Sequence, residues 1–199
     1  MMRIFKIAAA ALLVGSASWL SACAMNEDMS GDMASASANG VVTVGGAPMY
    51  ANRDIVANAV NSADHTTLVA AVKAAGLVGT LQSAGPFTVF APTNAAFGML
   101  PAGTVDTLLM PTNLAMLQSV LKYHVVPGRF TAASLAQRIR AGGGSARLAT
   151  ASGGTLTAKM RGDDIVIVDG KGGVATVTQA DVRQSNGVIH VTNRVSLAA

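Results

Sequence analysis

The hydrophobic positions of this chain change their spacing between its first and second halves. From Met49 to about residue 122 they recur at helical spacing, and proline, glycine or aspartate marks the ends of the apolar runs. After Gly128 they alternate with polar positions, and turn residues separate the alternating runs. We therefore expect helices first and β-hairpins later.

Individual elements follow from these two patterns. The clearest helical stripes lie in residues 55–60, 68–72 and 114–121. One buried strand is predicted inside the helical half at residues 86–92, PFTVFAP, which is β-branched and aromatic between prolines. The later strands are predicted at residues 147–150, 155–160, 164–168, 175–178 and 188–195. Helices that precede antiparallel strands indicate an α+β domain rather than a doubly wound parallel sheet.

The first 22 residues have the composition of an export signal. Two basic residues, Arg3 and Lys6, precede an apolar run at residues 7–20, and small residues follow it. The run is shorter than the roughly 20 residues that a membrane-spanning helix needs. We therefore predict a secretory signal peptide at residues 1–22.

The end of this signal, Leu20-Ser21-Ala22-Cys23, resembles the lipobox of bacterial lipoproteins. The resemblance implies that the Cys23 thiol is the lipid attachment site and that Cys23 becomes the first residue of the mature chain. Ala24 implies, by the same resemblance, sorting to the outer membrane. Ala22-Cys23-Ala24 also fits an ordinary A-x-A cleavage site, so a soluble secreted or periplasmic protein is the alternative.

Residues 23–47 are expected to be the lipidated cysteine followed by a flexible linker. They are rich in Ser, Ala, Gly, Asn and Met and contain no aromatic residue, so they offer little surface for burial. Residues 41–44 form the one apolar patch, which is either a short added strand or part of the linker, and we favour the linker. The folded domain is therefore predicted at residues 48–199.

Composition narrows the classes of protein that remain. The chain is 51% hydrophobic and 12% charged, as expected for a globular domain, and with only 4% aromatic residues its core must consist mainly of small aliphatic side chains. Cys23 is the only cysteine, which excludes an intrachain disulfide, a zinc ribbon and a Cys-x-x-C redox motif. The formal net charge of +4 includes no cluster of basic residues, so we expect no nucleic-acid partner.

The sequence lacks the common motifs of catalytic, cofactor-binding and metal-binding sites. There is no G-x-S-x-G motif, and the three histidines His65, His124 and His190 are too far apart for a metal pair on one helix. The glycine-rich stretches at residues 142–144 and 170–173 lack the spacing of phosphate-binding loops. The acidic residues Asp163, Asp164 and Asp169 are better explained by a hairpin turn than by a calcium loop. We therefore expect no cofactor and no metal.

Three separated motifs resemble those of the fasciclin domain, specifically its single-domain bacterial secreted or lipoprotein form. They are GPFTVFAPTNAAF at residues 85–97, LKYHVVPG at 121–128 and NGVIHVTNRVSL at 186–197, and the resemblance extends over residues 48–199. Asn193 departs from the Asp that this closing motif commonly carries. The resemblance implies a wedge of antiparallel β-strands flanked by several short helices, without catalytic activity.

The central motif contains the candidate binding residues, Tyr123 and His124, because the resemblance associates this segment with partner recognition. If the pair lies in a strand, adjacent side chains point to opposite faces, so one would be buried and the other accessible. A buried member would need hydrogen bonds, which Thr88, Thr93 or Asn94 of the first motif could supply. We favour a core role for His124, with partner binding through a nearby surface.

These observations together predict a non-catalytic adhesion or binding module of the bacterial cell envelope. It would be an outer-membrane lipoprotein that faces the periplasm or the cell surface, with an envelope or extracellular protein or polysaccharide as its partner. Two alternatives remain: a hydrolase of envelope polymers with His124 as its base, and a periplasmic stress-response binding protein.

Overall fold

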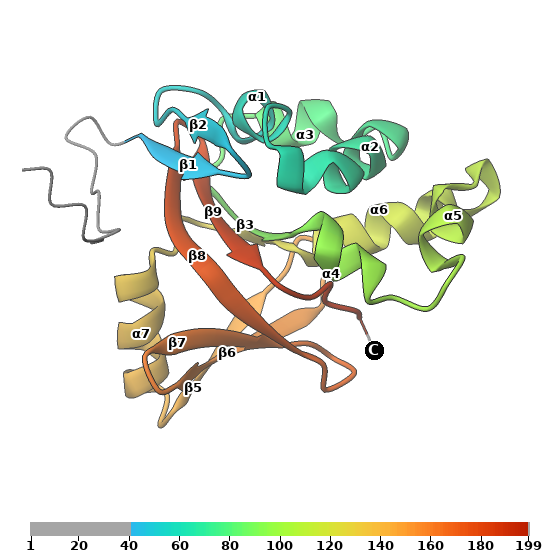
Figure 1. Cartoon of the computed structure of the whole chain (residues 1–199). Helices are drawn as coiled ribbons and strands as arrows, with labels where there is room; N and C mark the ends of the chain where they lie inside the picture. The colour runs from blue at the N-terminus through green and yellow to red at the C-terminus, as the bar shows by residue number, and fades with distance from the viewer. Residues whose placement is uncertain (1–40, 199) are drawn as a thin grey trace, which may run out of the picture. The chain divides into compact units, whose positions relative to one another are not determined.

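The computed structural model describes residues 41–198 of the 199-residue chain (Figure 1). The predicted signal peptide, Cys23 and most of the predicted linker lie outside the described residues. Within the described part, helices dominate up to residue 123 and strands dominate after residue 144. The predicted α+β class, a single domain with several short helices around a strand wedge, is confirmed.

The helices are short, and side chains at their first residues explain where several begin. Asp54 accepts a hydrogen bond from the Ala57 amide at 2.7 Å, and Thr93 and Thr131 cap two further helices in the same way. The helices are α1 (Ile55–Ala59), α2 (Thr66–Ala74), α3 (Val78–Gln82), α4 (Asn94–Gly98), α5 (Thr104–Leu109), α6 (Leu114–Tyr123) and α7 (Ala132–Ala141), with 3₁₀ turns η1 (Ala63–His65) and η2 (Pro111–Asn113).

Within residues 41–198, seven strands form one large sheet in the order β4-β3-β9-β8-β7-β6-β5. Neighbours are antiparallel except β3 and β9, which run parallel from Phe87 opposite Gly187 to Pro92 opposite Thr192. The strands are β3 (Phe87–Pro92), β4 (Val125–Pro127), β5 (Ser145–Ala149), β6 (Thr155–Arg161), β7 (Asp164–Val168), β8 (Val174–Gln184) and β9 (Gly187–Thr192). This parallel pair was not expected, since the predicted sheet was antiparallel. It is possible because β3 lies within the helical half of the chain and is not joined to β9 by a hairpin.

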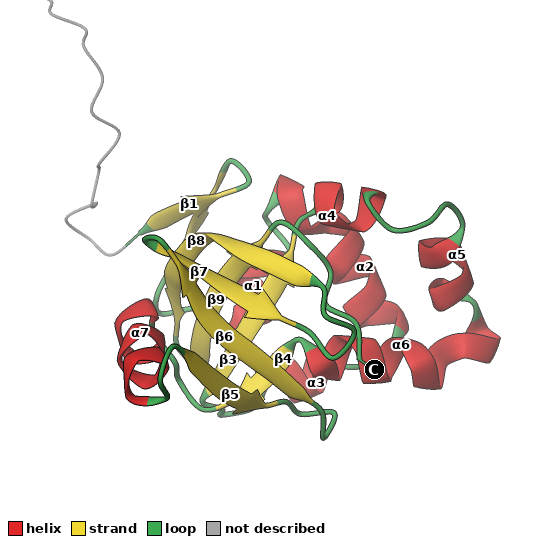
Figure 2. Ribbon diagram, turned by 90° about the horizontal axis from the view of Figure 1, so that it is seen from below, coloured by secondary structure: helices red, strands yellow, loops and turns green. Residues whose placement is uncertain are grey.

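The sheet is strongly curved, so that its two outermost strands approach each other. The Ala151 amide, just after β5, donates a 2.7 Å hydrogen bond to the Val125 carbonyl of β4. A register shift between Gln179 and Val182 in β8 adds to the bending. Figure 2 shows the resulting wedge, with α7 on one side and α2, α4, α5 and α6 grouped on the other.

Two hydrophobic cores hold these layers together. One packs the helical half and hairpin β1–β2 against β3 and β9, and it includes Leu68, Leu117 and Ile189. The other lies between α7 and the strands of the second half, and it includes Leu135 and Leu156. Valine, leucine, isoleucine and alanine make up nearly all of both cores, as the low aromatic content predicted.

The structure places the start of the domain earlier than the sequence pattern indicated. Residues 42–49 form a hairpin, β1 (Val42–Val44) and β2 (Ala47–Met49), instead of the end of a linker. Val44, Ala47 and Met49 are buried in the first core. The prediction of a domain that begins at residue 48 was wrong at this boundary, because a three-residue strand is too short to show a periodicity of its own.

Helix α7 is the largest element that the sequence interpretation missed, since only strands were expected after Gly128. Its signals are nonetheless present in the sequence. Thr131 accepts a hydrogen bond from the Ser134 amide at the first turn, and Leu135 and Ile139, four residues apart, are fully buried. Strand β8 is also longer than predicted, because its bulge interrupts the alternation of apolar residues.

Candidate functional site

Tyr123 and His124 lie at the end of α6 rather than in a strand. Tyr123 is the last residue of the helix, and His124 is its C-terminal cap, with its amide bonded to the Leu121 carbonyl. The side chains are only 1% and 3% exposed. The expectation that one of them is accessible was wrong, because the alternation of strand side chains does not apply to a helix end.

Both ring nitrogens of His124 are used in hydrogen bonds. Nδ1 donates to the Val120 carbonyl at 2.8 Å, and Nε2 accepts from the Ser196 amide at 2.9 Å. Burial lowers the pKa of His124, and the Val120 carbonyl and Asp169 oppose this shift more weakly. The imidazole is therefore neutral and joins the helix end to the C-terminal segment.

The Tyr123 hydroxyl also bridges two distant parts of the chain. It donates to the Thr155 carbonyl at 2.8 Å and accepts from the Gly170 amide at 2.9 Å. Burial raises the pKa of this phenol, so the hydroxyl keeps its proton. The partners expected from the first motif, Thr88, Thr93 and Asn94, bond elsewhere: Thr88, for example, bonds Gly128 and Phe130.

Asp169 completes this group of buried hydrogen bonds. Its carboxylate accepts bonds from the amides of Lys171 and Gly173 at 3.0 and 2.7 Å, and from the Leu197 amide at 2.9 Å. It therefore shapes the β7–β8 turn and fixes the C-terminal segment to it. We call Tyr123, His124 and Asp169 the α6 anchor, because they attach the end of α6 to the sheet and to the C-terminus.

In the described part of the chain, the fold does not bring residues that are distant in sequence together into a metal site. Among residues 41–198, no three His, Cys, Asp or Glu side chains lie close enough together to hold an ion. Asp163 and Asp164 are exposed at the β6–β7 hairpin turn, away from the buried Asp169. The acidic residues are thus accounted for by turn geometry.

The geometry is also unfavourable for a hydrolase that uses His124 as its base. A general base needs a free nitrogen within reach of its substrate, whereas both nitrogens of His124 are bonded and its ring is buried. A serine does contact another histidine, since Ser62 Oγ lies 2.9 Å from His65 Nδ1. Ser62 is only 1% exposed, so no substrate can reach this hydroxyl.

Exposed apolar side chains point to a different candidate site. Four of the seven large hydrophobic residues exposed among residues 41–198 fall in the short stretch from residue 99 to residue 116. We call these four the methionine surface: Met99 (63% exposed), Met110 (51%), Leu114 (36%) and Met116 (59%). Met99 directly follows α4, Met110 lies between α5 and η2, and Leu114 and Met116 lie on α6. Helix α5 packs against both η2 and α6.

The sequence interpretation did not identify this surface. Leu114 was assigned to the buried stripe of α6, but only Leu117 and Leu121 of that stripe are buried. The available signal was Met116, an apolar residue that lies off the stripe. Exposed methionine is a common feature of protein-binding surfaces because its flexible, polarisable side chain adapts to different partners.

Comparison with known proteins identifies the family. The family model of the fasciclin domain matches residues 63–197 of the sequence. The chain belongs to the fasciclin domain family. It is 50% identical over 145 residues to protein sll1483 of Synechocystis, an alignment that covers 72% of each chain. It is also 41% identical over 121 residues to immunogenic protein MPB70 of Mycobacterium bovis, with 58% of each chain covered.

A solved structure of the same family has the same fold. The FAS1 domain pair from the insect cell adhesion molecule Fasciclin I superimposes with a TM-score of 0.66 at 18% identity, covering 73% of this chain and 51% of that one. Residues of the fasciclin motifs form internal hydrogen bonds in this protein. Asn193, which departs from the usual Asp, still accepts the Thr176 amide at 2.9 Å, because an amide oxygen serves as well as a carboxylate.

The helices of the described domain are short, and the longest, α6 and α7, have 10 residues each. Within residues 41–198, none has both the length and the apolar composition that crossing a bilayer requires.

Proposed function

We propose that this protein is a non-catalytic binding module of the bacterial cell envelope, attached to the membrane through a lipid on Cys23. The methionine surface is the observation that carries the proposal. Three methionines and a leucine are exposed within residues 99–116. We infer that enough of them share one face of the domain for a partner to bury them together, because contiguous exposed apolar patches usually mark sites of association. We assign partner binding to this surface, with the α6 anchor as its support.

A protein is the favoured partner rather than a polysaccharide. Sugar hydroxyls need hydrogen-bonding groups, and the side chains of methionine and leucine offer at most a weak sulfur acceptor. Apolar protein segments, in contrast, bury the same side chains with a gain of about 25 cal/mol per Å². The α6 anchor supports this role because it holds the C-terminal end of α6, the helix that carries Leu114 and Met116.

Lipid attachment is supported by the chain itself and by one relative. The only cysteine directly follows Leu-Ser-Ala at the end of an apolar run. A mycobacterial relative, 55% identical over 53 residues, which is 27% of this chain and 23% of its own, is named cell surface glycolipoprotein MPB83. Because one acyl chain alone binds membranes weakly, we expect more than one on the mature cysteine.

Fractionation of cells that express Cys23→Ser tests the anchor. We expect the variant to move from the membrane fraction to the soluble fraction with an unchanged melting temperature, because the cysteine precedes the described domain. Mass spectrometry of the mature N-terminus identifies the modification. An unmodified chain that begins at Met25 would contradict the anchor and support ordinary secretion.

Capture of envelope proteins tests the binding surface. The triple variant Met99→Gln, Met110→Gln and Met116→Gln keeps side-chain length and removes apolar character, so we expect it to lose most of the capture seen with the wild type. Met160→Gln is the matched control, since Met160 is also exposed but lies on β6. Retained capture by the triple variant, or binding to purified envelope polysaccharide alone, would contradict the assignment.

A further inference from the structure

Methionine supplies most of the large apolar side chains that the described domain exposes. Four of the five methionines among residues 41–198 are exposed, whereas Leu114 is the one exposed leucine in that part of the chain. Leucine has a similar volume and is equally apolar, so apolar character alone does not require methionine. Methionine adds flexibility, and it also adds a thioether sulfur that mild oxidants convert into a polar sulfoxide.

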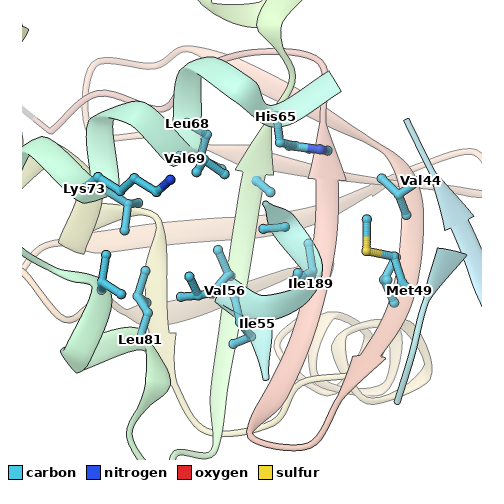
Figure 3. A pocket seen from close by; sticks show the side chains of 16 residues that line it. Val44, Met49, Ile55, Val56, His65, Leu68, Val69, Lys73, Leu81 and Ile189 are labelled. Carbon is cyan, nitrogen blue, oxygen red and sulfur yellow. The ribbon is translucent and has the colours of Figure 1, made fainter. Parts of the chain in front are cut away.

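The exposed methionine side chains are open to small oxidants. Met99, Met110 and Met116 are 63%, 51% and 59% exposed. Met49 provides the contrast, since it is 3% exposed and its side chain lies with that of Val44 in the apolar interior (Figure 3). An oxidant must reach the sulfur atom to react with it. The three exposed methionines should therefore react first, and Met49 last.

No free thiol of the mature chain competes with these methionines. Cys23 is the only cysteine, and the proposed lipid occupies its sulfur. Peroxides that reach a bacterium from outside pass through the envelope before they enter the cytoplasm. An envelope protein with exposed methionines is therefore in a position to respond to them.

We propose that Met99, Met110 and Met116 are sites of reversible oxidation that releases the bound partner. A lone pair of the thioether sulfur attacks one oxygen of hydrogen peroxide, so that an S–O bond forms and the O–O bond breaks. The proton of the transferred oxygen passes to the leaving hydroxide, which departs as water. Sulfur is oxidised and peroxide is reduced. The proposal rests on the assignment of partner binding to the methionine surface and adds its regulation.

Oxidation changes the binding surface without changing the core. A sulfoxide needs a hydrogen-bond donor, which a partner surface shaped for apolar side chains does not offer. Each sulfoxide that the partner buries unpaired should weaken binding by about fivefold or more. Met49 keeps its thioether while it remains buried, so the first core stays intact. We therefore expect the partner to dissociate from a domain that remains folded.

Treatment of the full-length chain carrying Cys23→Ser with hydrogen peroxide tests the proposal. Peptide mass spectrometry follows each methionine, and Met99, Met110 and Met116 should be oxidised before Met49. Capture of protein from a detergent-solubilised envelope extract should fall by about fivefold or more as these sulfoxides accumulate, with an unchanged urea midpoint. Methionine sulfoxide reductases A and B, which together reduce both sulfoxide epimers, should restore capture.

A matched variant separates the methionine surface from the other reactive methionines. Substitution of Met25, Met29, Met33 and Met160 by leucine leaves the surface as it is, so oxidation should reduce capture by this variant as much as by the parent chain. Capture that survives oxidation in either protein, or oxidation of Met49 as fast as the surface methionines, would overturn the inference. Absence of capture before any oxidation would instead overturn the proposed function, and the inference with it.

Discussion

At the scale of single residues, buried histidines act in this protein as hydrogen-bonding links between segments. His124 joins the end of α6 to the C-terminal segment. His190, on β9, donates from Nε2 to the Phe130 carbonyl at 2.7 Å, accepts the Asp181 amide at 3.3 Å and stacks on Phe90. Both rings are held neutral by burial, which suits linking groups better than binding groups.

The structural role of His124 predicts a loss of stability on truncation. His124→Ala leaves the Val120 carbonyl and the Ser196 amide without their partner, so we expect the free energy of unfolding to fall by about 1 to 3 kcal/mol, with any cavity adding to the loss. Tyr123→Phe keeps the ring and removes one hydroxyl, so we expect a smaller loss of about 1 kcal/mol.

Urea unfolding of the wild type and both variants checks this expectation, with envelope-protein capture measured on the same samples. Capture by His124→Ala should decline only in proportion to the unfolded fraction. An unchanged urea midpoint together with lost capture would mean that His124 contacts the partner directly.

The three buried histidines also predict how stability depends on pH. Burial lowers the pKa values of His65, His124 and His190 below the ordinary value of 6.5. Between the lowered values and 6.5 the unfolded chain binds more protons than the folded chain, so the free energy of unfolding falls as the pH drops below 6.5. Above 6.5 this contribution to stability is fully present.

Urea unfolding between pH 7.5 and pH 5.5 measures the effect before most carboxylates titrate. We expect the midpoint to be constant at the upper end of this range and to decrease steadily below pH 6.5. A midpoint that does not change over the whole range would contradict neutral, buried histidines.

At the scale of elements, the hairpin β1–β2 extends the fasciclin fold at its N-terminal side. The Ala63 amide donates to the Gly45 carbonyl at 3.1 Å, and Gln179 Nε2 donates to the Thr43 carbonyl at 3.0 Å. Position 45 requires glycine for two reasons: its backbone is left-handed (φ +56°), and a Cβ there would lie 2.4 Å from Ser62 Oγ. These contacts indicate that the hairpin is part of the folded domain.

Deletion of residues 24–45 is therefore expected to lower the melting temperature by roughly 5 to 10 °C, because it removes β1 and the buried Val44. Deletion of residues 24–40 serves as the control and should leave the melting temperature nearly unchanged. Calorimetry of the two deletions gives the comparison. Equal melting temperatures would show that the hairpin contributes little to stability.

Elements with a clear local pattern could be predicted from the sequence. The strand at residues 86–92, the helix at 114–121 and the strand at 164–168 were all predicted at or near their observed positions. Elements that depend on distant contacts could not be predicted. The Thr43 carbonyl of β1 accepts a hydrogen bond from Gln179 Nε2, and the parallel pairing of β3 with β9 joins residues about 100 positions apart. The exposure of Leu114 likewise depends on what packs against α6.

At the scale of the whole molecule, the features combine into a well-packed support that carries the proposed binding surface. The curved sheet and its two aliphatic cores hold the helical half in place. The α6 anchor then fixes the helix that presents part of the methionine surface. Sequence motifs identified the family because they lie in this support. They did not indicate the proposed binding surface, because exposed apolar residues follow no periodicity.

Photo-crosslinking in intact cells tests the central claim most directly. A photoreactive amino acid replaces Met116 in one strain and Met160 in another, both positions being exposed. We predict that irradiation yields a discrete crosslinked protein from position 116 and none from position 160. Crosslinks of equal yield from both positions, or none from position 116, would contradict partner binding at the methionine surface.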